Sequence, residues 1–196
     1  MAHKLALVAF SFLTFATLAV AQVPHANVFF GYSYYNTDLS SIDRTNANGW
    51  EASIEGKVIP LLGFVADVDT HYGSQGFPCT PSFGLGCPVS VASVPPGGSV
   101  GFNDSFTERN FLFGPRVSIS VAKFRPFAEA LFGGAHASLD NGVGSSTSFA
   151  TALGGGLDYK IIPLIAWRFQ GDYVQTRLFS ATQNNVRIST GLVLRF

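Results

Sequence analysis

Charged side chains in this 196-residue chain recur at alternate positions of apolar segments, and they are the residues best placed to do chemistry. Acids and bases are nearly balanced among them, so we expect paired charges that fill the inside of the fold. A narrow or gated path for ions along the same side chains is the alternative. The side chains concerned are Glu51, Glu55, Lys57, Asp67, Asp69, His71, Glu108, Arg116, Glu129, Asp158, Lys160, Arg168, Asp172, Arg187 and Arg195.

A second candidate is the pair His136 and Ser138, which would share one face of a strand, so that a base and a nucleophile could meet. A catalytic triad also needs a carboxylate that orients the base. Asp140 lies at the edge of a loop and no Glu follows it, so we expect a structural role and no catalytic residue. We expect His71, next to Asp69, to be structural as well.

The two cysteines, Cys79 and Cys87, lie in a segment rich in Pro and Gly, and their close spacing in an exported chain predicts a disulfide. A disulfide that closes such a short loop would stabilise that loop locally and contribute little to the stability of the fold. Two cysteines without a nearby His pair do not predict a metal site. Gly154–Gly156 precedes no helix that could bind a phosphate, so we expect no cofactor.

The composition favours strands over helices and argues against nucleic acid as a partner. Charged residues make up 12% of the chain, aromatic residues 14%, and Gly contributes 21 residues. Aromatic residues are typical of strands, whereas the helix-favouring residues Glu, Lys and Met are scarce. The net charge is zero, which leaves no electrostatic attraction for nucleic acid.

The first 21 residues have the organisation of a secretory signal peptide. A short basic start ending at Lys4 precedes an apolar stretch from Leu5 to Ala19, and Ala19 and Ala21 supply a small-x-small cleavage pattern. A permanent membrane anchor is the alternative, but it needs about 20 apolar residues. We therefore expect a signal peptide over 1–21 and one mature domain over 22–196.

Eight segments of the mature chain alternate between apolar and polar residues, as strands do. In the last segment, the apolar face runs from Val186 to Phe196 and Thr190 is its only polar member. The segments cover about 27–36, 50–58, 62–71, 108–121, 125–138, 148–160, 165–173 and 186–196.

The length of these segments and the placement of their charges predict a barrel that spans a membrane. A tilted spanning strand needs about 9–11 residues, longer than most strands of soluble sheets. An apolar face towards lipid and a polar face towards the interior fit a closed transmembrane barrel, because an open strand edge in hydrocarbon leaves backbone groups unpaired. We expect aromatic girdles from Trp50, Tyr159, Trp167, Tyr173 and Phe196.

Short and long connections alternate along the predicted barrel. The short ones carry a proline, at Pro60, Pro126 and Pro163. The long ones cover about 37–48, 73–104, 140–146 and 175–185. Outer-membrane barrels have short periplasmic turns and long external loops, so both termini should be periplasmic and 73–104 should form a long external loop.

The chain resembles the small outer-membrane β-barrels of the outer-membrane-protein-A-like and opacity-type porin family. The features that carry the resemblance are the signal peptide, the opening Phe29–Tyr34 and the ending Val186–Phe196. In that family, a terminal aromatic residue preceded by alternating apolar residues is read by the outer-membrane assembly machinery. Here the corresponding residues are Ile188, Leu192, Leu194 and Phe196.

The resemblance and the residue pattern together predict an all-β, eight-stranded, antiparallel up-and-down barrel in the bacterial outer membrane. We expect a monomer that contacts outer-membrane lipid and could bind an external ligand at its loops. A structural or surface-interaction role without enzymatic activity is our leading hypothesis, because the interior charges look self-paired. A narrow porin-like channel is the second. A lipid A-modifying enzyme is the third, since lipid A deacylases are eight-stranded barrels with a His/Ser pair similar to His136 and Ser138.

Overall fold

The computed structural model describes residues 26–37, 44–79, 100–139, 145–178 and 182–196, and these residues form eight β-strands. The strands contain between 12 and 19 residues each. All eight predicted segments correspond to strands. Their bounds are β1 Ala26–Thr37, β2 Thr45–Lys57, β3 Leu62–Cys79, β4 Val100–Ser118, β5 Phe124–Leu139, β6 Ser145–Ile162, β7 Ile165–Thr176 and β8 Gln183–Arg195.

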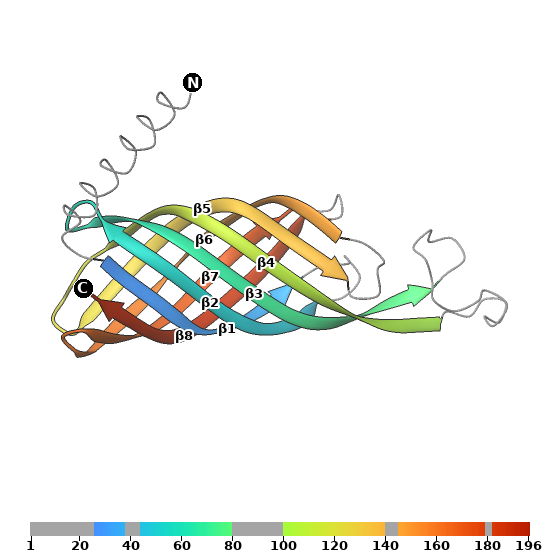
Figure 1. Cartoon of the computed structure of the whole chain (residues 1–196), viewed down its shortest axis with the longest axis horizontal. Coiled ribbons are helices and arrows are strands. Elements are labelled where there is room, and N and C mark those ends of the chain that lie inside the picture. The colour runs from blue at the N-terminus through green and yellow to red at the C-terminus, as the bar shows by residue number, and fades with distance from the viewer. Residues whose placement is uncertain (1–25, 38–43, 80–99, 140–144, 179–181) are drawn as a thin grey trace, which may run out of the picture.

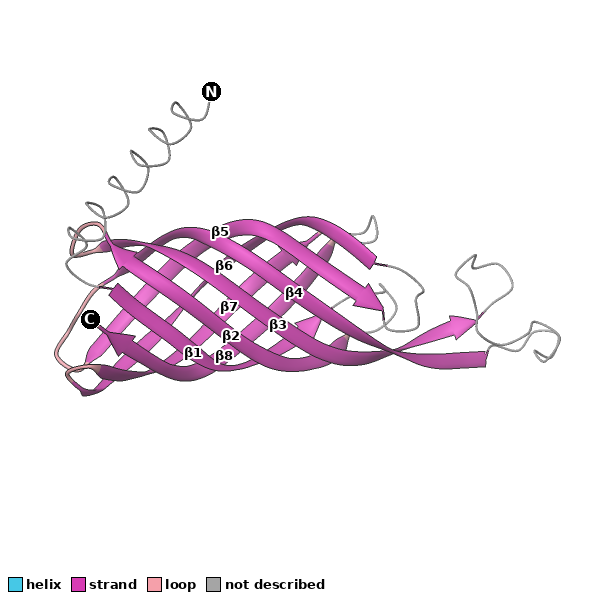
Figure 2. Ribbon diagram, viewed as in Figure 1, coloured by secondary structure: helices cyan, strands magenta, loops and turns pink. Residues whose placement is uncertain are grey.

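Each strand is hydrogen-bonded to the strands before and after it, and β1 pairs with β8 to close a barrel. Every pairing is antiparallel, and the closing pair runs from Asn27 opposite Arg195 to Asn36 opposite Val186. Figure 1 shows the strands wound around a common axis, and Figure 2 shows how little of the described chain lies outside strands. The prediction of an eight-stranded up-and-down barrel is confirmed.

The strands β3 and β4 are longer than the sequence pattern indicated. Their ladder continues to Cys79 opposite Val100, within the segment 73–104 that we expected to be irregular. The alternation of side chains fades there because Gly and Pro interrupt it, yet the backbones remain paired. The loop boundary predicted at residue 73 was therefore wrong.

Three short turns lie at one end of the barrel, where β1 begins and β8 ends (Figure 1). They connect β2 to β3, β4 to β5 and β6 to β7. In the second turn, Val121 and Phe124 form an isolated bridge, and Ala122 takes the left-handed backbone conformation, with φ 54°. We refer to this end as the short-turn end and to the opposite end as the long-loop end.

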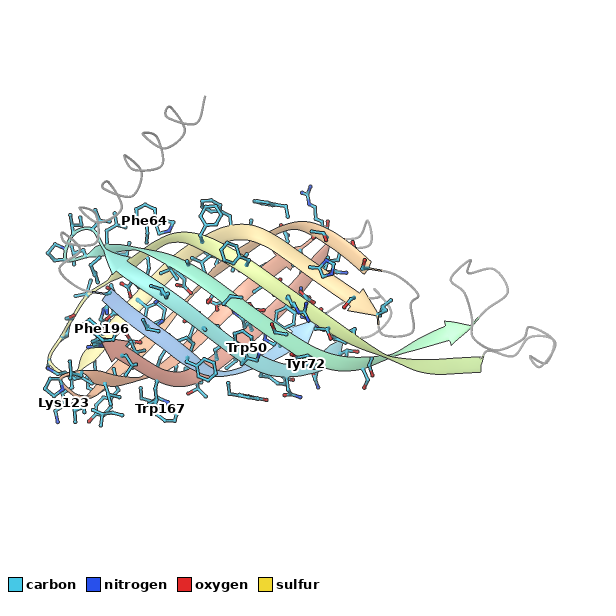
Figure 3. All side chains as sticks on the ribbon, viewed as in Figure 1. Trp50, Phe64, Tyr72, Lys123, Trp167 and Phe196 are labelled. Atoms are coloured by element: carbon cyan, nitrogen blue, oxygen red, sulfur yellow. The ribbon has the colours of Figure 1, made fainter. Side chains whose placement is uncertain are left out.

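The outer wall of the barrel is apolar. Leu153 is 67% exposed and Phe30 is 63% exposed, and both point away from the lumen. Figure 3 shows Phe64, Trp167 and Phe196 projecting outwards near the short-turn end, with Trp50 and Tyr72 further along. Such a surface is unfavourable in water but suits an apolar environment.

Thr190, a polar residue among the apolar side chains on the outward face of β8, is hydrogen-bonded within the wall. The indole Nε1 of Trp167 donates to Thr190 Oγ1 at 2.9 Å, and that hydroxyl donates to the Arg168 carbonyl at 3.0 Å. A polar group on an apolar surface costs little when its hydrogen bonds are made internally. The neighbouring Trp167 therefore explains how the apolar pattern tolerates this threonine.

Candidate functional site

The inward faces of the strands form a lumen in which acidic side chains are concentrated. Every Asp and Glu whose side chain is described is buried, with at most 3% of its surface exposed. The strand period places them there, because residues two apart in a strand point to the same side. The acids are Glu51, Glu55, Asp67, Asp69, Glu108, Glu129, Asp158 and Asp172.

Near the short-turn end, basic side chains gather around Glu55 and Asp158, and we call this group the basic cluster. Arg125 Nη2 lies 2.6 Å from Glu55 Oε1, and Asn27 Nδ2 donates to Glu55 Oε2 at 3.1 Å. Arg168 donates to both oxygens of Asp158, at 2.7 and 3.1 Å. The cations of the basic cluster are Lys57, Arg116, Arg125, Arg168 and Arg195.

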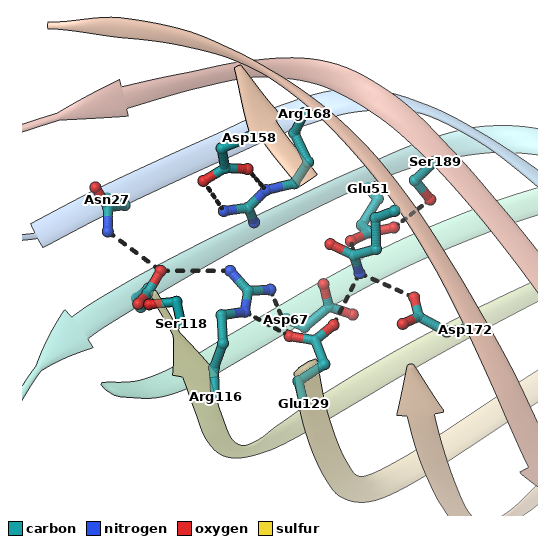
Figure 4. A network of polar contacts seen from close by, with 12 residues as sticks. Asn27, Glu51, Asp67, Arg116, Ser118, Glu129, Asp158, Arg168, Asp172 and Ser189 are labelled. Atoms are coloured by element: carbon teal, nitrogen blue, oxygen red, sulfur yellow. Dashed lines mark hydrogen bonds and ion pairs between the residues drawn. The ribbon is translucent and has the colours of Figure 1, made fainter. Parts of the chain in front are cut away.

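Arg116 and Arg168 also contact aromatic rings inside the lumen. The Arg116 guanidinium lies 4.4 Å from the centroid of the Phe127 ring, and that of Arg168 lies 4.6 Å from the same ring. Arg168 is also 5.0 Å from the Phe29 ring centroid. Cation–π contacts of this kind favour arginine, whose planar group stacks while its edges bind carboxylates. Figure 4 shows Arg116 between strands, bonded to Glu129.

Further along the lumen, a single arginine is surrounded by carboxylates, and we call this group the acidic cluster. Arg187 lies 2.8 Å from both Asp67 and Asp172 and also contacts Asp69. Its Nε is 3.5 Å from Glu51 Oε2. One guanidinium therefore faces four carboxylates, which leaves an excess of acidic groups in a buried region.

Gln170 connects the acidic cluster to the basic cluster. Its amide nitrogen lies 3.2 Å from Glu51, and 2.9 Å from both Glu129 and Asp172. An amide has two N–H protons, so it cannot donate fully to three carboxylates at once. Glu129 in turn accepts from Arg116 Nε at 2.6 Å. The two clusters thus form one continuous polar network, part of which is drawn in Figure 4.

Ser33, His71 and Asp69 are arranged in the order of a hydrolase triad inside the lumen. Ser33 Oγ lies 2.8 Å from His71 Nε2, and His71 Nδ1 lies 3.1 Å from Asp69 Oδ1. However, none of the three side chains has any exposed surface. Ser33 also accepts a hydrogen bond from Ser189, at 2.9 Å. A nucleophile must reach a substrate, so burial argues against catalysis at this group.

Apolar side chains also fill part of the lumen, and we call this group the apolar cluster. Phe106, Leu112 and Leu131 are among its largest members, and each is at most 2% exposed. Tyr35 joins the cluster and donates to Glu108 Oε1 at 2.9 Å. The other described members are Ala47, Val65, Ala135, Ala137, Ala150, Ala152, Val174 and Leu178.

The structure places most of the sequence-selected charges in the lumen. Glu51, Asp67, Asp69, Asp172 and Arg187 meet in the acidic cluster, whereas Glu55, Lys57, Asp158, Arg168 and Arg195 meet in the basic cluster. Glu108, Arg116 and Glu129 are buried as well, with Arg116 and Glu129 paired to each other. Lys160 has no ion pair with the described residues.

Sequence reasoning missed two features of the lumen. Arg125 binds Glu55 and Ser118, although its segment had no clear polar face. Arg125 lies four positions before Glu129 in the same segment, so the two residues share one face of the strand, and this was the available signal. Phe106 was not assigned to the lumen, because the predicted strand began only at residue 108.

The remaining candidates are placed differently. His136 points outwards, and its Nδ1 lies 2.7 Å from Thr147 Oγ1, with no carboxylate among its described hydrogen-bond partners. The Cys79 side chain and Cys87 fall outside the described residues, as do 1–21, so the disulfide and the signal peptide stay predictions. The described residues contain no cluster of three or more His, Cys, Asp or Glu that could hold a metal.

Within the same described ranges, no helix is both long and apolar enough to cross a membrane.

Comparisons with known proteins identify the fold through structure rather than sequence. The sequence matches no family model and no curated protein. Neisserial surface protein A, a solved structure, has a TM-score of 0.64 at 14% identity over 87% of this chain and 97% of its own. Ail, the attachment invasion locus protein of Yersinia pestis, solved with the heparin analogue sucrose octasulfate, has a TM-score of 0.53 at 14% identity over 88% and 98%. The fold is therefore that of the small outer-membrane barrels.

Proposed function

We propose that this protein is a bacterial outer-membrane barrel with a structural or surface-interaction role, whose lumen is closed by its own side chains. The observation that carries the proposal is the contrast between the two faces of each strand. Large apolar residues such as Phe111 and Leu153 are more than half exposed on the outer wall, whereas the described carboxylates are buried inside. This arrangement suits lipid outside and a filled lumen within.

The barrel would stand with its short-turn end in the periplasm and its long-loop end outside the cell, since that is the rule for outer-membrane barrels. Ile188, Leu192 and Leu194 on the outward face of β8 and the following residue Phe196 are exposed, so the assembly machinery could read them. A cysteine introduced in place of Ser145, at the start of β6, would test the orientation. It should react with an impermeant maleimide on intact cells, whereas a cysteine in place of Lys123 should not.

Conductance in a planar bilayer tests whether the lumen is closed. The refolded protein should give no discrete current steps, because Arg116, Glu129 and Gln170 cross the lumen in the polar network. Current steps from the native protein would contradict the proposal and favour the narrow porin-like channel. The matched positive control is Arg116→Ala combined with Glu129→Ala, which removes paired side chains and should open a path.

The channel remains the second candidate because of one specific observation. Oxygen atoms of Asp67, Gln170 and Asp172 are buried without a hydrogen-bond partner among the described residues. Buried acceptors of this kind bind water readily. If a chain of water crosses the lumen, the current should be selective for cations, because acidic groups outnumber Arg187 in the acidic cluster.

The proposal assigns no enzymatic activity to Ser33 or to His136. A fluorophosphonate probe, which labels activated serines, should leave the folded protein unmodified because Ser33 has no exposed surface. Labelling that disappears in Ser33→Ala would contradict this assignment. Likewise, lipid A incubated with the protein should stay unaltered, and an alteration that is lost in Ser138→Ala would favour a lipid-modifying enzyme.

A further inference from the structure

A cavity of about 540 Å³ opens at the short-turn end of the lumen. Its walls come from all three short turns and from the ends of β1 and β8. Lys57, Arg125 and Arg195 line it together with Asn27, and Ile59, Leu164 and Phe196 add apolar surface. The cavity is therefore large enough for a small molecule, and both cations and apolar groups line it.

Positive charge exceeds negative charge around this cavity. The basic cluster contains five cations, whereas its carboxylates are Glu55 and Asp158, with Glu129 shared through Arg116. Even with Glu129 included, two positive charges have no carboxylate of their own. The terminal carboxylate of Phe196 forms no ion pair with the described cations. A buried excess of charge is costly unless a counter-charge is bound.

Hydrogen-bond donors without acceptors lie in the same region. Arg195 Nε and Arg168 Nη1 are buried, and neither has a partner among the described residues. Arg168 is 1% exposed, so water from the bulk solvent does not satisfy it directly. Arg195 lines the cavity, and 20% of its side chain is exposed. Its Nη2 donates to Asp158 Oδ2 at 3.3 Å. Such donors can bind an additional anionic oxygen.

We propose that this cavity binds a phosphate-bearing anion, held by Lys57, Arg125 and Arg195. A phosphate group offers several acceptor oxygens and the charge that the basic cluster lacks. The apolar wall around Ile59, Leu164 and Phe196 would accept an organic substituent esterified to that phosphate. A phospholipid headgroup and free inorganic phosphate share this chemistry, and the site itself does not depend on whether the lumen conducts.

The test is nuclear magnetic resonance of the arginine Nε–H groups in the full chain folded in maltoside micelles, a detergent without phosphate. Addition of inorganic phosphate should shift the signals of Arg125 and Arg195 in a saturable manner. If inorganic phosphate has no effect, phosphatidylglycerol in nanodiscs should shift them, with phosphatidylcholine nanodiscs as the neutral reference. A shift with phosphatidylglycerol alone identifies a headgroup site. Absence of a shift with both phosphate and phosphatidylglycerol overturns the proposal.

Variants at the rim of the cavity make the test specific. Lys57→Gln and Arg195→Gln should each weaken binding about tenfold, since each removes a charge-assisted hydrogen bond. The matched control is Lys123→Gln, an exposed cation at the same end that does not line the cavity. Retained heat-modifiable migration on a gel shows that each variant folds. Equal binding by all three folded variants would overturn the assignment of these ligands.

Discussion

Two groups of side chains fill the lumen by different means. In the polar network, Arg116, Arg168 and Arg187 are held by carboxylates. In the apolar cluster, Phe106 and Leu131 fill space with apolar surface. In the polar network, the cost of a substitution depends on the charge that loses its partner. In the apolar cluster, it depends on the volume removed. Substitutions of similar size in the two groups should therefore change the free energy of unfolding for different reasons and by different amounts.

The largest effect should follow from Arg187→Met, which keeps much of the side-chain length but removes the charge. Four carboxylates would lose their common partner, because Arg187 contacts Glu51, Asp67, Asp69 and Asp172. Breaking a buried ion pair costs about 3–5 kcal/mol, so we expect a loss of about 4 kcal/mol in the free energy of unfolding. Urea unfolding in lipid vesicles, followed by gel migration, measures it. A loss below about 1 kcal/mol would show that the pairing contributes little.

Leu131→Ala is the corresponding change in the apolar cluster. Leu131 is 2% exposed within the apolar cluster, so its truncation leaves a cavity. We expect a loss of about 3 kcal/mol in the free energy of unfolding, insensitive to salt because no charge is involved. The matched control is Leu153→Ala on the outer wall, where the side chain is 67% exposed and no cavity forms. Equal losses for the two variants would contradict the packing argument.

Two glycines on neighbouring strands sharpen the comparison between the lumen and the outer wall. A Cβ added to Gly154 would lie 2.0 Å from Asp172 Oδ1 and 2.4 Å from the Gly171 carbonyl, whereas one added to Gly171 meets nothing within 4 Å. Gly154→Ala should therefore cost about 2 kcal/mol by overpacking beside the acidic cluster. Gly171→Ala should leave the free energy of unfolding within about 0.5 kcal/mol of the native value. Thermal melts of both variants measure the two losses of stability. A larger loss for Gly171→Ala than for Gly154→Ala would contradict the prediction.

A small effect should also come from Glu108→Gln, although Glu108 is fully buried. It accepts from Tyr35 through one oxygen, and its other oxygen has no partner among the described residues. The glutamine keeps an acceptor for Tyr35 and removes a carboxylate that has no cation beside it. We expect a change within about 1 kcal/mol, or a gain in stability, because a lone buried charge is unfavourable. A loss as large as that of Arg187→Met would contradict the distinction between paired and lone carboxylates.

The fold could be predicted from the sequence because the alternation within each strand shows which residues face the lumen and which face outwards. In β7, the alternation from Ile165 to Tyr173 places Trp167 and Phe169 outside and Arg168 and Asp172 inside, as the structure has them. Antiparallel neighbours joined by short turns then leave few possible pairings.

The contents of the lumen were harder to predict, because they depend on residues that meet across it. Arg125 reaches Glu55, which lies 70 positions away in the sequence, and Arg187 reaches Asp67 over 120 positions. Alternation assigns a side chain to the lumen but not to a height along it, since the height depends on how the strands are staggered around the barrel. The meeting of Arg125 with Glu55 and of Arg187 with Asp67 follows from that stagger.

The extended ladder of β3 and β4 has a mechanical consequence. From Tyr72 to Cys79 the two backbones remain paired, as Figure 1 shows for the hairpin that projects past the other strands. At about 3.3 Å per residue, this stretch of β3 measures roughly 23 Å along the strand. A paired ribbon resists bending better than a single chain does. The paired ends of β3 and β4 therefore extend past the ends of the other described strands as one stiff unit rather than as two single chains.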